Sequence, residues 1–88
     1  MIEIKYADNY IKRLLGLMFK KNINYGLCFP KCNSIHTFLM RIPIDVIMTD
    51  KNYNIQYIFN NLKPNKIILP KKNVYYTFEL PINKFSFK

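Results

Sequence analysis

The sequence predicts a small, mainly β (α+β) domain: a twisted sheet or half-barrel of about six or seven short strands with one N-terminal helix. Apolar and polar residues alternate in several short segments, as in half-buried strands. Turn-forming residues separate these segments at short intervals. One early segment instead has apolar residues at helical spacing. At 88 residues, the chain has room for a single domain, residues 1–88, with one modest core.

Two periodicities predict the first strand and the helix. Within residues 2–6, apolar and charged side chains alternate, which indicates a short half-buried strand. Asp8 or Asn9 can then cap a helix. The predicted helix has one apolar stripe and ends at the polar residues 20–22; the stripe is formed by Ile11, Leu14, Leu15 and Met18.

The middle of the chain predicts strands at residues 25–29, 35–40, 44–49 and 55–59. Pro43 separates the second from the third, because proline cannot donate to a strand ladder. The segment 44–49 is apolar on both faces apart from Asp45, which is typical of a central strand. A turn over residues 50–54 joins it to the next strand, so these two strands are expected to form a hairpin.

The last third predicts a loop, a short apolar piece and one well-marked strand. Residues 60–66 are polar and contain Pro64, as expected of a loop, and residues 67–69 are apolar. The clearest alternation follows, and Pro81 is expected to end that strand. One face of the strand carries Val74, Tyr76, Phe78 and Leu80, and a final short strand is predicted around Phe85 and Phe87.

The charge of the chain is strongly basic, with 14 Lys and Arg against 5 Asp and Glu and a net charge of +9. Such a charge suits nucleic acid or an anionic membrane surface. The lysines are scattered, however, so nucleic-acid binding is an unlikely alternative, and a bias towards AT-rich codons also explains them. No segment reaches the roughly 20 apolar residues of a transmembrane helix. No secretion signal is visible, and the cytoplasm is the expected location.

The densest group of polar residues lies in an otherwise apolar region and comprises Cys32, His36, Arg41, Asp45 and Asp50. A buried histidine or carboxylate needs a partner, since leaving it unpaired costs free energy. We expect His36, Arg41 and Asp45 to form an internal polar network that fixes the chain around Pro43. The functional alternative is a histidine–carboxylate pair ready for proton transfer.

Catalytic and metal-binding interpretations of the cysteines are weaker. Cys28, Cys32 and His36 have a C-x3-C-x3-H spacing, but Cys28 lies in an apolar strand, so no metal or cofactor is predicted. A Cys32 nucleophile with His36 as its base would need a tight turn, because residues four apart in a strand lie about 13 Å from each other. His36, Asp45 and Cys32 are therefore weak catalytic candidates.

Two loop segments have alternative interpretations. The turn after Asp50 starts like a calcium loop but has Ile55 where a glycine is required and Asn61 where a glutamate is required, so a hairpin turn explains it better. The basic residues between 63 and 72, followed by Tyr75 and Tyr76, could hold phosphate and stack bases. A solvated loop beside a strand is the favoured interpretation.

Several motifs together resemble one known protein family. They occupy residues 13–20, 26–29 and 32–46, Asp50, residues 62–64 and residues 78–81. This set resembles the bacterial and archaeal family known as domain of unknown function 192 (DUF192). The resemblance implies a compact, mainly β fold with one helix, and it implies no activity. Many members carry secretion signals or lipoprotein leaders, and a glycine with a longer tail usually follows the Glu-Leu motif, where this chain has Ile82.

These observations favour a small non-enzymatic binding or interaction module. Its candidate ligand-binding residues are Arg13, His36, Arg41 and Asp45, with an anionic small ligand or a protein as partner. Arg13 and Arg41 stand out in a lysine-dominated chain, and guanidinium groups suit carboxylates and phosphates. The alternatives are a small enzyme using His36 with Asp45 or Cys32, and a basic nucleic-acid-binding module.

Overall fold

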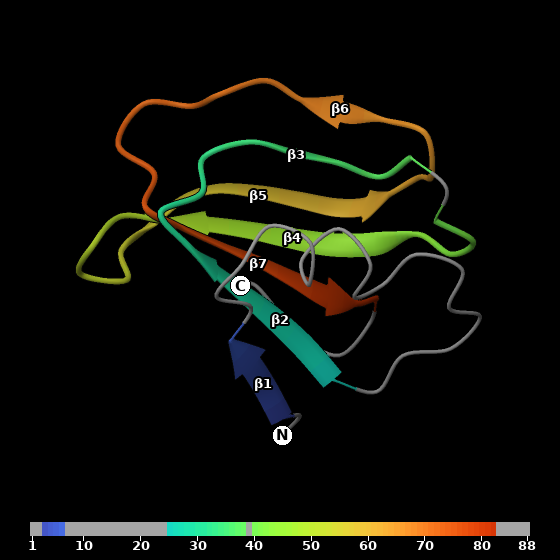
Figure 1. Cartoon of the computed structure of the whole chain (residues 1–88), viewed down its shortest axis with the longest axis horizontal. Helices are drawn as coiled ribbons and strands as arrows, with labels where there is room; N and C mark the ends of the chain where they lie inside the picture. The colour runs from blue at the N-terminus through green and yellow to red at the C-terminus, as the bar shows by residue number, and fades with distance from the viewer. Residues whose placement is uncertain (1–2, 7–24, 39, 83–88) are drawn as a thin grey trace.

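In the part of the chain that the structure describes, the fold consists of seven strands in two sheets (Figure 1). The structure, a computed structural model, describes residues 3–6, 25–38 and 40–82. No helix occurs within these ranges. The residues of the predicted helix between Asp8 and Asn22 and of the strand predicted around Phe85 lie outside them. The strands are β1 (Glu3–Tyr6), β2 (Tyr25–Pro30), β3 (Ile35–His36), β4 (Ile44–Thr49), β5 (Ile55–Leu62), β6 (Ile67–Ile68) and β7 (Tyr76–Pro81).

The larger sheet has the strand order β1-β2-β7-β4-β5 and is open, with β1 and β5 at its edges. β1 pairs with β2 in parallel, and the other pairs in this sheet are antiparallel. β3 and β6 form a separate two-stranded antiparallel sheet. The mainly β class is confirmed, as are the β4–β5 hairpin and the central position of β4, whose six residues are all buried.

The largest differences from the predicted strand boundaries are in β3 and β5. β3 ends at His36 and does not continue to Met40, because Thr37 turns the chain. Its backbone oxygen accepts hydrogen bonds from the backbone N–H groups of Asn65 (2.8 Å) and Met40 (3.3 Å). Its hydroxyl donates to the backbone oxygen of Lys63 at 2.7 Å. β5 extends through Leu62 into the predicted loop, since Leu62 still pairs with Ile44 of β4.

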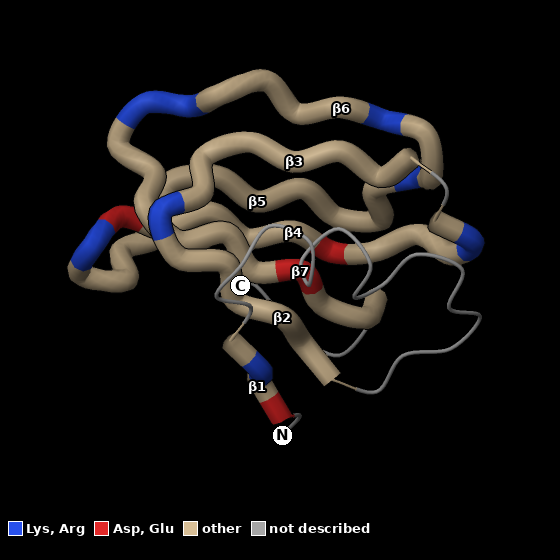
Figure 2. Tube along the Cα trace, viewed as in Figure 1, with Lys and Arg blue, Asp and Glu red and all other residues tan. Residues whose placement is uncertain are grey.

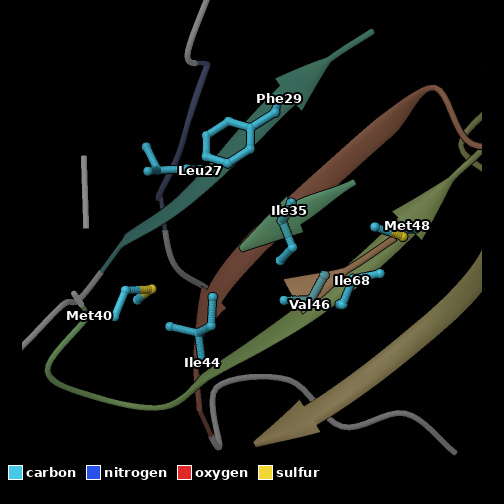
Figure 3. Close-up of a cluster of buried hydrophobic side chains, with 8 residues drawn as sticks. All are labelled: Leu27, Phe29, Ile35, Met40, Ile44, Val46, Met48 and Ile68. Atoms are coloured by element: carbon cyan, nitrogen blue, oxygen red, sulfur yellow. The ribbon is translucent and has the colours of Figure 1, made fainter. Parts of the chain in front are cut away.

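The core lies between the two sheets. Figure 3 shows β3 and β6 side chains over one face of the larger sheet, where they meet residues of β2 and β4. The buried cluster comprises Leu27, Phe29, Ile35, Met40, Ile44, Val46, Met48 and Ile68. The opposite face of the larger sheet is also buried at its centre, where Cys28 and Leu80 are 0% and 1% exposed. The inner strands β4 and β7 are therefore largely enclosed on both faces of the larger sheet.

Because both faces of β7 are covered, the alternation of apolar and polar residues in this strand does not mark one face as exposed to solvent. Thr77 and Glu79 alternate with the apolar positions of the strand, yet they are 0% and 5% exposed. Glu79 pairs with Leu27 on β2 and Val46 on β4, so it shares a face with core residues. The Thr77 hydroxyl donates to the backbone oxygen of Cys32 at 2.9 Å.

Within the described ranges, no helix is long and apolar enough to span a bilayer.

Candidate functional site

Asp45, a predicted site residue, has a backbone partner in the structure. The residue is 5% exposed, and its carboxylate accepts a hydrogen bond from the backbone N–H of Asn61 at 2.8 Å. In the described ranges, no hydrogen bond or ion pair joins Asp45 to His36 or Arg41. The prediction that Asp45 is buried and paired is therefore right, whereas the predicted partners are wrong. The reason is local: β5 bulges opposite Asp45, and the bulge presents a free N–H group.

His36 and Arg41 do not converge on a common point with Asp45. The His36 ring stacks on Phe38 with 4.9 Å between ring centroids, and its Nδ1 accepts a hydrogen bond from the backbone N–H of Phe38 at 3.3 Å. Because Ile35 points into the core, its neighbour His36 on the same strand points away from it. Arg41 is exposed in the bend before β4. The fourth ligand-binding candidate, Arg13, lies outside the described residues.

The cysteines have separate environments. Cys28 is fully buried in β2, and burial raises the pKa of its thiol to about 11. Cys32 is half-buried, and its thiol donates to the backbone oxygen of Ser34 at 3.1 Å. Across the part of the chain that the structure describes, His36 has no hydrogen bond to Cys32, and no three His, Cys, Asp or Glu side chains cluster closely enough to hold a metal ion.

Asp50 caps the turn between β4 and β5. Its carboxylate accepts hydrogen bonds from the backbone N–H groups of Asn54 (2.9 Å) and Asn52 (2.8 Å), and from the side-chain amide of Asn54 (3.1 Å). These bonds, those with Asn54 above all, hold the pKa of Asp50 below its usual value. The hairpin-turn interpretation of this segment is confirmed.

A pocket of about 520 Å³ lies at this same end of the sheet, between three turns that are distant in the sequence. The turns follow β2, connect β4 to β5, and precede β7. The side chains around the pocket are mostly amides and lysines, with one carboxylate and one tyrosine. They are Asn33, Asp50, Lys51, Asn52, Gln56, Lys71, Lys72, Asn73, Val74 and Tyr75.

Backbone hydrogen bonds between the turns fix the frame of this pocket. The N–H of Lys71 donates to the oxygen of Asn33 at 3.0 Å, which ties the last turn to the first. The N–H of Tyr75 donates to the oxygen of Thr49 at 2.8 Å, and the oxygen of Tyr75 accepts from the N–H of Cys32 at 2.9 Å. The pocket is therefore built on the same contacts that hold β2, β4 and β7 together.

The charge around the pocket is positive. Among the described lining residues, Lys51, Lys71 and Lys72 contribute three ammonium groups, and Asp50 contributes the single carboxylate, which is hydrogen-bonded within its own turn. Two of the lysines lie over aromatic rings. The Nζ of Lys51 is 5.4 Å from the ring centroid of Tyr75, and the Nζ of Lys71 is 5.5 Å from that of Tyr57. Such cation–π contacts restrict where these ammonium groups can go.

The sequence interpretation missed this pocket for an identifiable reason. Its lysines lie in separate turns, Lys51 after β4 and Lys71 and Lys72 before β7, and only the tertiary structure brings them to one pocket. Figure 2 shows that the basic segments of these two turns lie on the same side of the molecule. The mixed basic and aromatic stretch ending at Tyr75 was the one available signal, and it was interpreted as a solvated loop. Glu79 was also missed, because the alternation of its strand does not reveal that both faces are covered.

Comparison with known proteins identifies the family. The model of the DUF192 family, described as an uncharacterised group, matches residues 1–86. The chain belongs to the DUF192 family. This confirms the resemblance inferred from the motifs, and it adds no activity, since no function is given for the DUF192 model.

Curated relatives of this DUF192 protein occur in archaea and bear the name UPF0127 protein. One from Pyrococcus horikoshii is 44% identical over 85 residues, which are 90% of this chain and 72% of the relative. Another from Thermococcus kodakarensis is 37% identical and covers 91% of this chain, but the match spans only 54% of that relative.

Two solved structures share the fold of this DUF192 chain. A protein of unknown function from Novosphingobium aromaticivorans superimposes with a TM-score of 0.79 at 18% identity, over 93% of this chain and 64% of that one. A Sinorhizobium meliloti protein proposed to be a transcription regulator gives a TM-score of 0.76 at 22% identity, over 90% of this chain and 67% of that one. At such identities the likeness concerns the fold alone.

Proposed function

We propose that this DUF192 protein is a non-enzymatic binding module whose pocket between the three turns holds a small anionic ligand. The observation that carries the proposal is the meeting of Lys51, Lys71 and Lys72 around one pocket whose only carboxylate, that of Asp50, is already hydrogen-bonded to its own turn. Three ammonium groups against one carboxylate leave the described lining with a net positive charge, which favours an anion.

The lining indicates the chemical class of the ligand. Lysine offers a compact charge that suits phosphate or carboxylate oxygens, and the neighbouring amides of Asn33, Asn52 and Gln56 can donate and accept hydrogen bonds. The volume falls within the roughly 300–1,000 Å³ common for small-molecule sites. A phosphorylated or carboxylated metabolite fits these features better than an apolar ligand does.

A nucleic acid is the second candidate, and one observation favours it. Beside the pocket, the ring of Tyr76 stacks on Tyr53 with 4.6 Å between centroids and meets Tyr75 edge-on at 4.7 Å. Tyr53 is 53% exposed. Exposed aromatic rings next to lysines are typical of surfaces that bind single-stranded nucleic acids.

The test is an NMR titration of the amide resonances with inorganic phosphate and, separately, with a short oligothymidine. Phosphate is expected to shift the amides of the three turns, and Lys72→Gln should weaken its binding about threefold to tenfold. Lys66→Gln is the matched control, because Lys66 is also exposed and does not line the pocket. The proposal would be contradicted if phosphate shifted no amide resonance of the pocket. It would also be contradicted if Lys72→Gln and Lys66→Gln weakened phosphate binding equally.

The oligothymidine separates the two candidates. A nucleic-acid-binding surface should bind it far more tightly than phosphate, with a steep dependence on salt, and Lys66→Gln should then weaken binding as well. The predicted arginine site is tested in the same titration. If Arg41 or Arg13 holds the anion, Arg41→Lys or Arg13→Lys should weaken phosphate binding without unfolding the protein, and Lys72→Gln should not.

A further inference from the structure

β5 has one edge that no described strand covers. It is the last strand of the larger sheet and pairs with β4 only. Among the described residues, no backbone–backbone hydrogen bond outside the strand ladders involves Ile55–Leu62. No described residue therefore occupies the backbone groups of β5 that point away from β4, and these groups can pair with another extended chain.

The side chains of β5 do not protect this edge. Ile55, Tyr57 and Ile58 are 53%, 37% and 39% exposed. The chain carries 14 Lys and Arg and 5 Asp and Glu, yet the eight residues of β5 include no charged residue and no proline. Charges and prolines are two of the means by which edge strands avoid pairing with other chains, and β-bulges are a third. Irregular register near both ends of β5 leaves Tyr57–Phe59 as its regular part.

The charges around β5 indicate what kind of strand would pair with it. Lys51 precedes the strand, directly after Asp50, and Lys63 follows it. Figure 2 shows an acidic and a basic residue in the turn before β5 and basic residues in the turn after it. The carboxylate of Asp50 is hydrogen-bonded within its own turn, and that of Asp45 is buried and bonded to Asn61. A partner strand with acidic residues at both ends would match this pattern.

The same charges disfavour a second copy of this chain. If the β5 strands of two copies paired antiparallel, Lys51 of each copy would lie near Lys63 of the other. Like charges would therefore meet at both ends of the paired strands. Each copy also has a net charge of +9. The long-range repulsion between two copies therefore opposes their association.

We propose that the free edge of β5 binds an extended, acidic segment of a partner protein by strand addition. Main-chain hydrogen bonds to the edge supply affinity, and contacts with Ile55, Tyr57 and Ile58 supply the apolar part. The flanking lysines select acidic partners. This surface shares Lys51 and Gln56 with the lining of the anion pocket, but strand addition uses the backbone edge of β5. The proposal therefore holds whether or not the pocket binds a ligand.

The test uses a synthetic peptide of alternating valine and threonine with glutamates at both ends. It should bind with amide shifts along Ile55–Leu62 and slow the hydrogen exchange of outward-pointing β5 amides. Methylating alternate peptide nitrogens on the pairing edge should abolish binding, because it removes the donors. Ile58→Glu should weaken binding about tenfold by placing a like charge against the peptide, whereas Ile58→Val should leave it close to wild type.

Three results would overturn the proposal: a methylated peptide that binds as well as the unmethylated one, a lysine-flanked peptide that binds equally well, or a wild-type protein that forms a dimer lost in Ile58→Glu. The first would show that charge alone binds the peptide, and the last that a second copy occupies the edge. Lys72→Gln distinguishes this surface from the pocket, since it should reduce phosphate binding while β5 still responds to the peptide.

Discussion

The carboxylate of Asp45 on β4 accepts a hydrogen bond from the backbone N–H of Asn61 on β5, at 2.8 Å. Asn61 lies where β5 carries extra residues relative to β4, and its φ of 55° is in the left-handed region that asparagine tolerates. The buried carboxylate therefore satisfies a backbone donor that the bulge removes from the ladder. Asp45 fixes the register of the hairpin from inside the sheet.

Asp45→Ala is expected to lower the free energy of unfolding by about 1–3 kcal/mol, because the N–H of Asn61 loses its partner. Asp45→Asn keeps an oxygen acceptor at the same place and should cost less. Urea unfolding followed by circular dichroism measures both. An alanine variant as stable as wild type, with altered phosphate binding, would instead make Asp45 a ligand-binding residue.

Asp45 also shows how far sequence reasoning reached. A carboxylate between Ile44 and Val46 predicts burial and a partner, and both are found. The partner could not be predicted, because it is the backbone N–H of Asn61 and not the side chain of His36 or Arg41. A backbone donor exposed by a bulge depends on the exact register of two strands, which the residue pattern alone does not specify.

The fold was more predictable than the candidate site, for a related reason. Strands such as β4 and β7 were predicted because their periodicity is local, and the hairpin because its turn is local. β3 was predicted too long, since Thr37 ends it through bonds to residues 63–66, far along the chain. The lysines of the pocket likewise come from two separate turns, so no local pattern contains them.

The two cysteines are expected to differ in reactivity. Burial raises the pKa of Cys28 to about 11, and a thiol reacts as its thiolate. Cys28 in the native protein should therefore resist a disulfide reagent such as DTNB near pH 8, while the half-buried Cys32 reacts first. Cys32→Ser should leave almost no rapid reaction, and urea should restore it. Rapid labelling of native Cys32→Ser would contradict the enclosed position of Cys28.

Gly26 is expected to resist replacement by alanine. A Cβ atom at this position would lie 2.6 Å from Cδ2 of Leu80 and 2.7 Å from Cδ1 of Ile4, so both side chains would have to shift. Overpacking of this kind costs about 1–3 kcal/mol of stability. Thermal unfolding of Gly26→Ala, of Ile4→Ala and of the double variant tests this expectation. The double variant should lose less stability than the sum of the losses of the two single variants. Simple additivity would show that Ile4 is not the obstacle.

The burial of Glu79 is expected to make the stability of the fold depend on pH. Burial among core residues raises its pKa to about 8 from an ordinary value of 4.5. The folded protein therefore keeps a proton that the unfolded chain releases between these two values. The resulting stability is fully present below about pH 4.5 and is lost as the pH rises through about 8, at no more than about 1.4 kcal/mol per pH unit.

Glu79→Gln should remove this dependence, because the amide stays neutral throughout. Its free energy of unfolding, measured in urea from about pH 5 to about pH 9, should vary less than that of wild type, and the variant should be the more stable of the two at the alkaline end. Glu3→Gln is the control, since Glu3 is exposed on β1 and its replacement should leave the pH profile unchanged. A wild-type stability that rises with pH across this range, or a glutamine variant with the wild-type slope, would show that the carboxyl of Glu79 is ionised in the native core and held there by a positive partner.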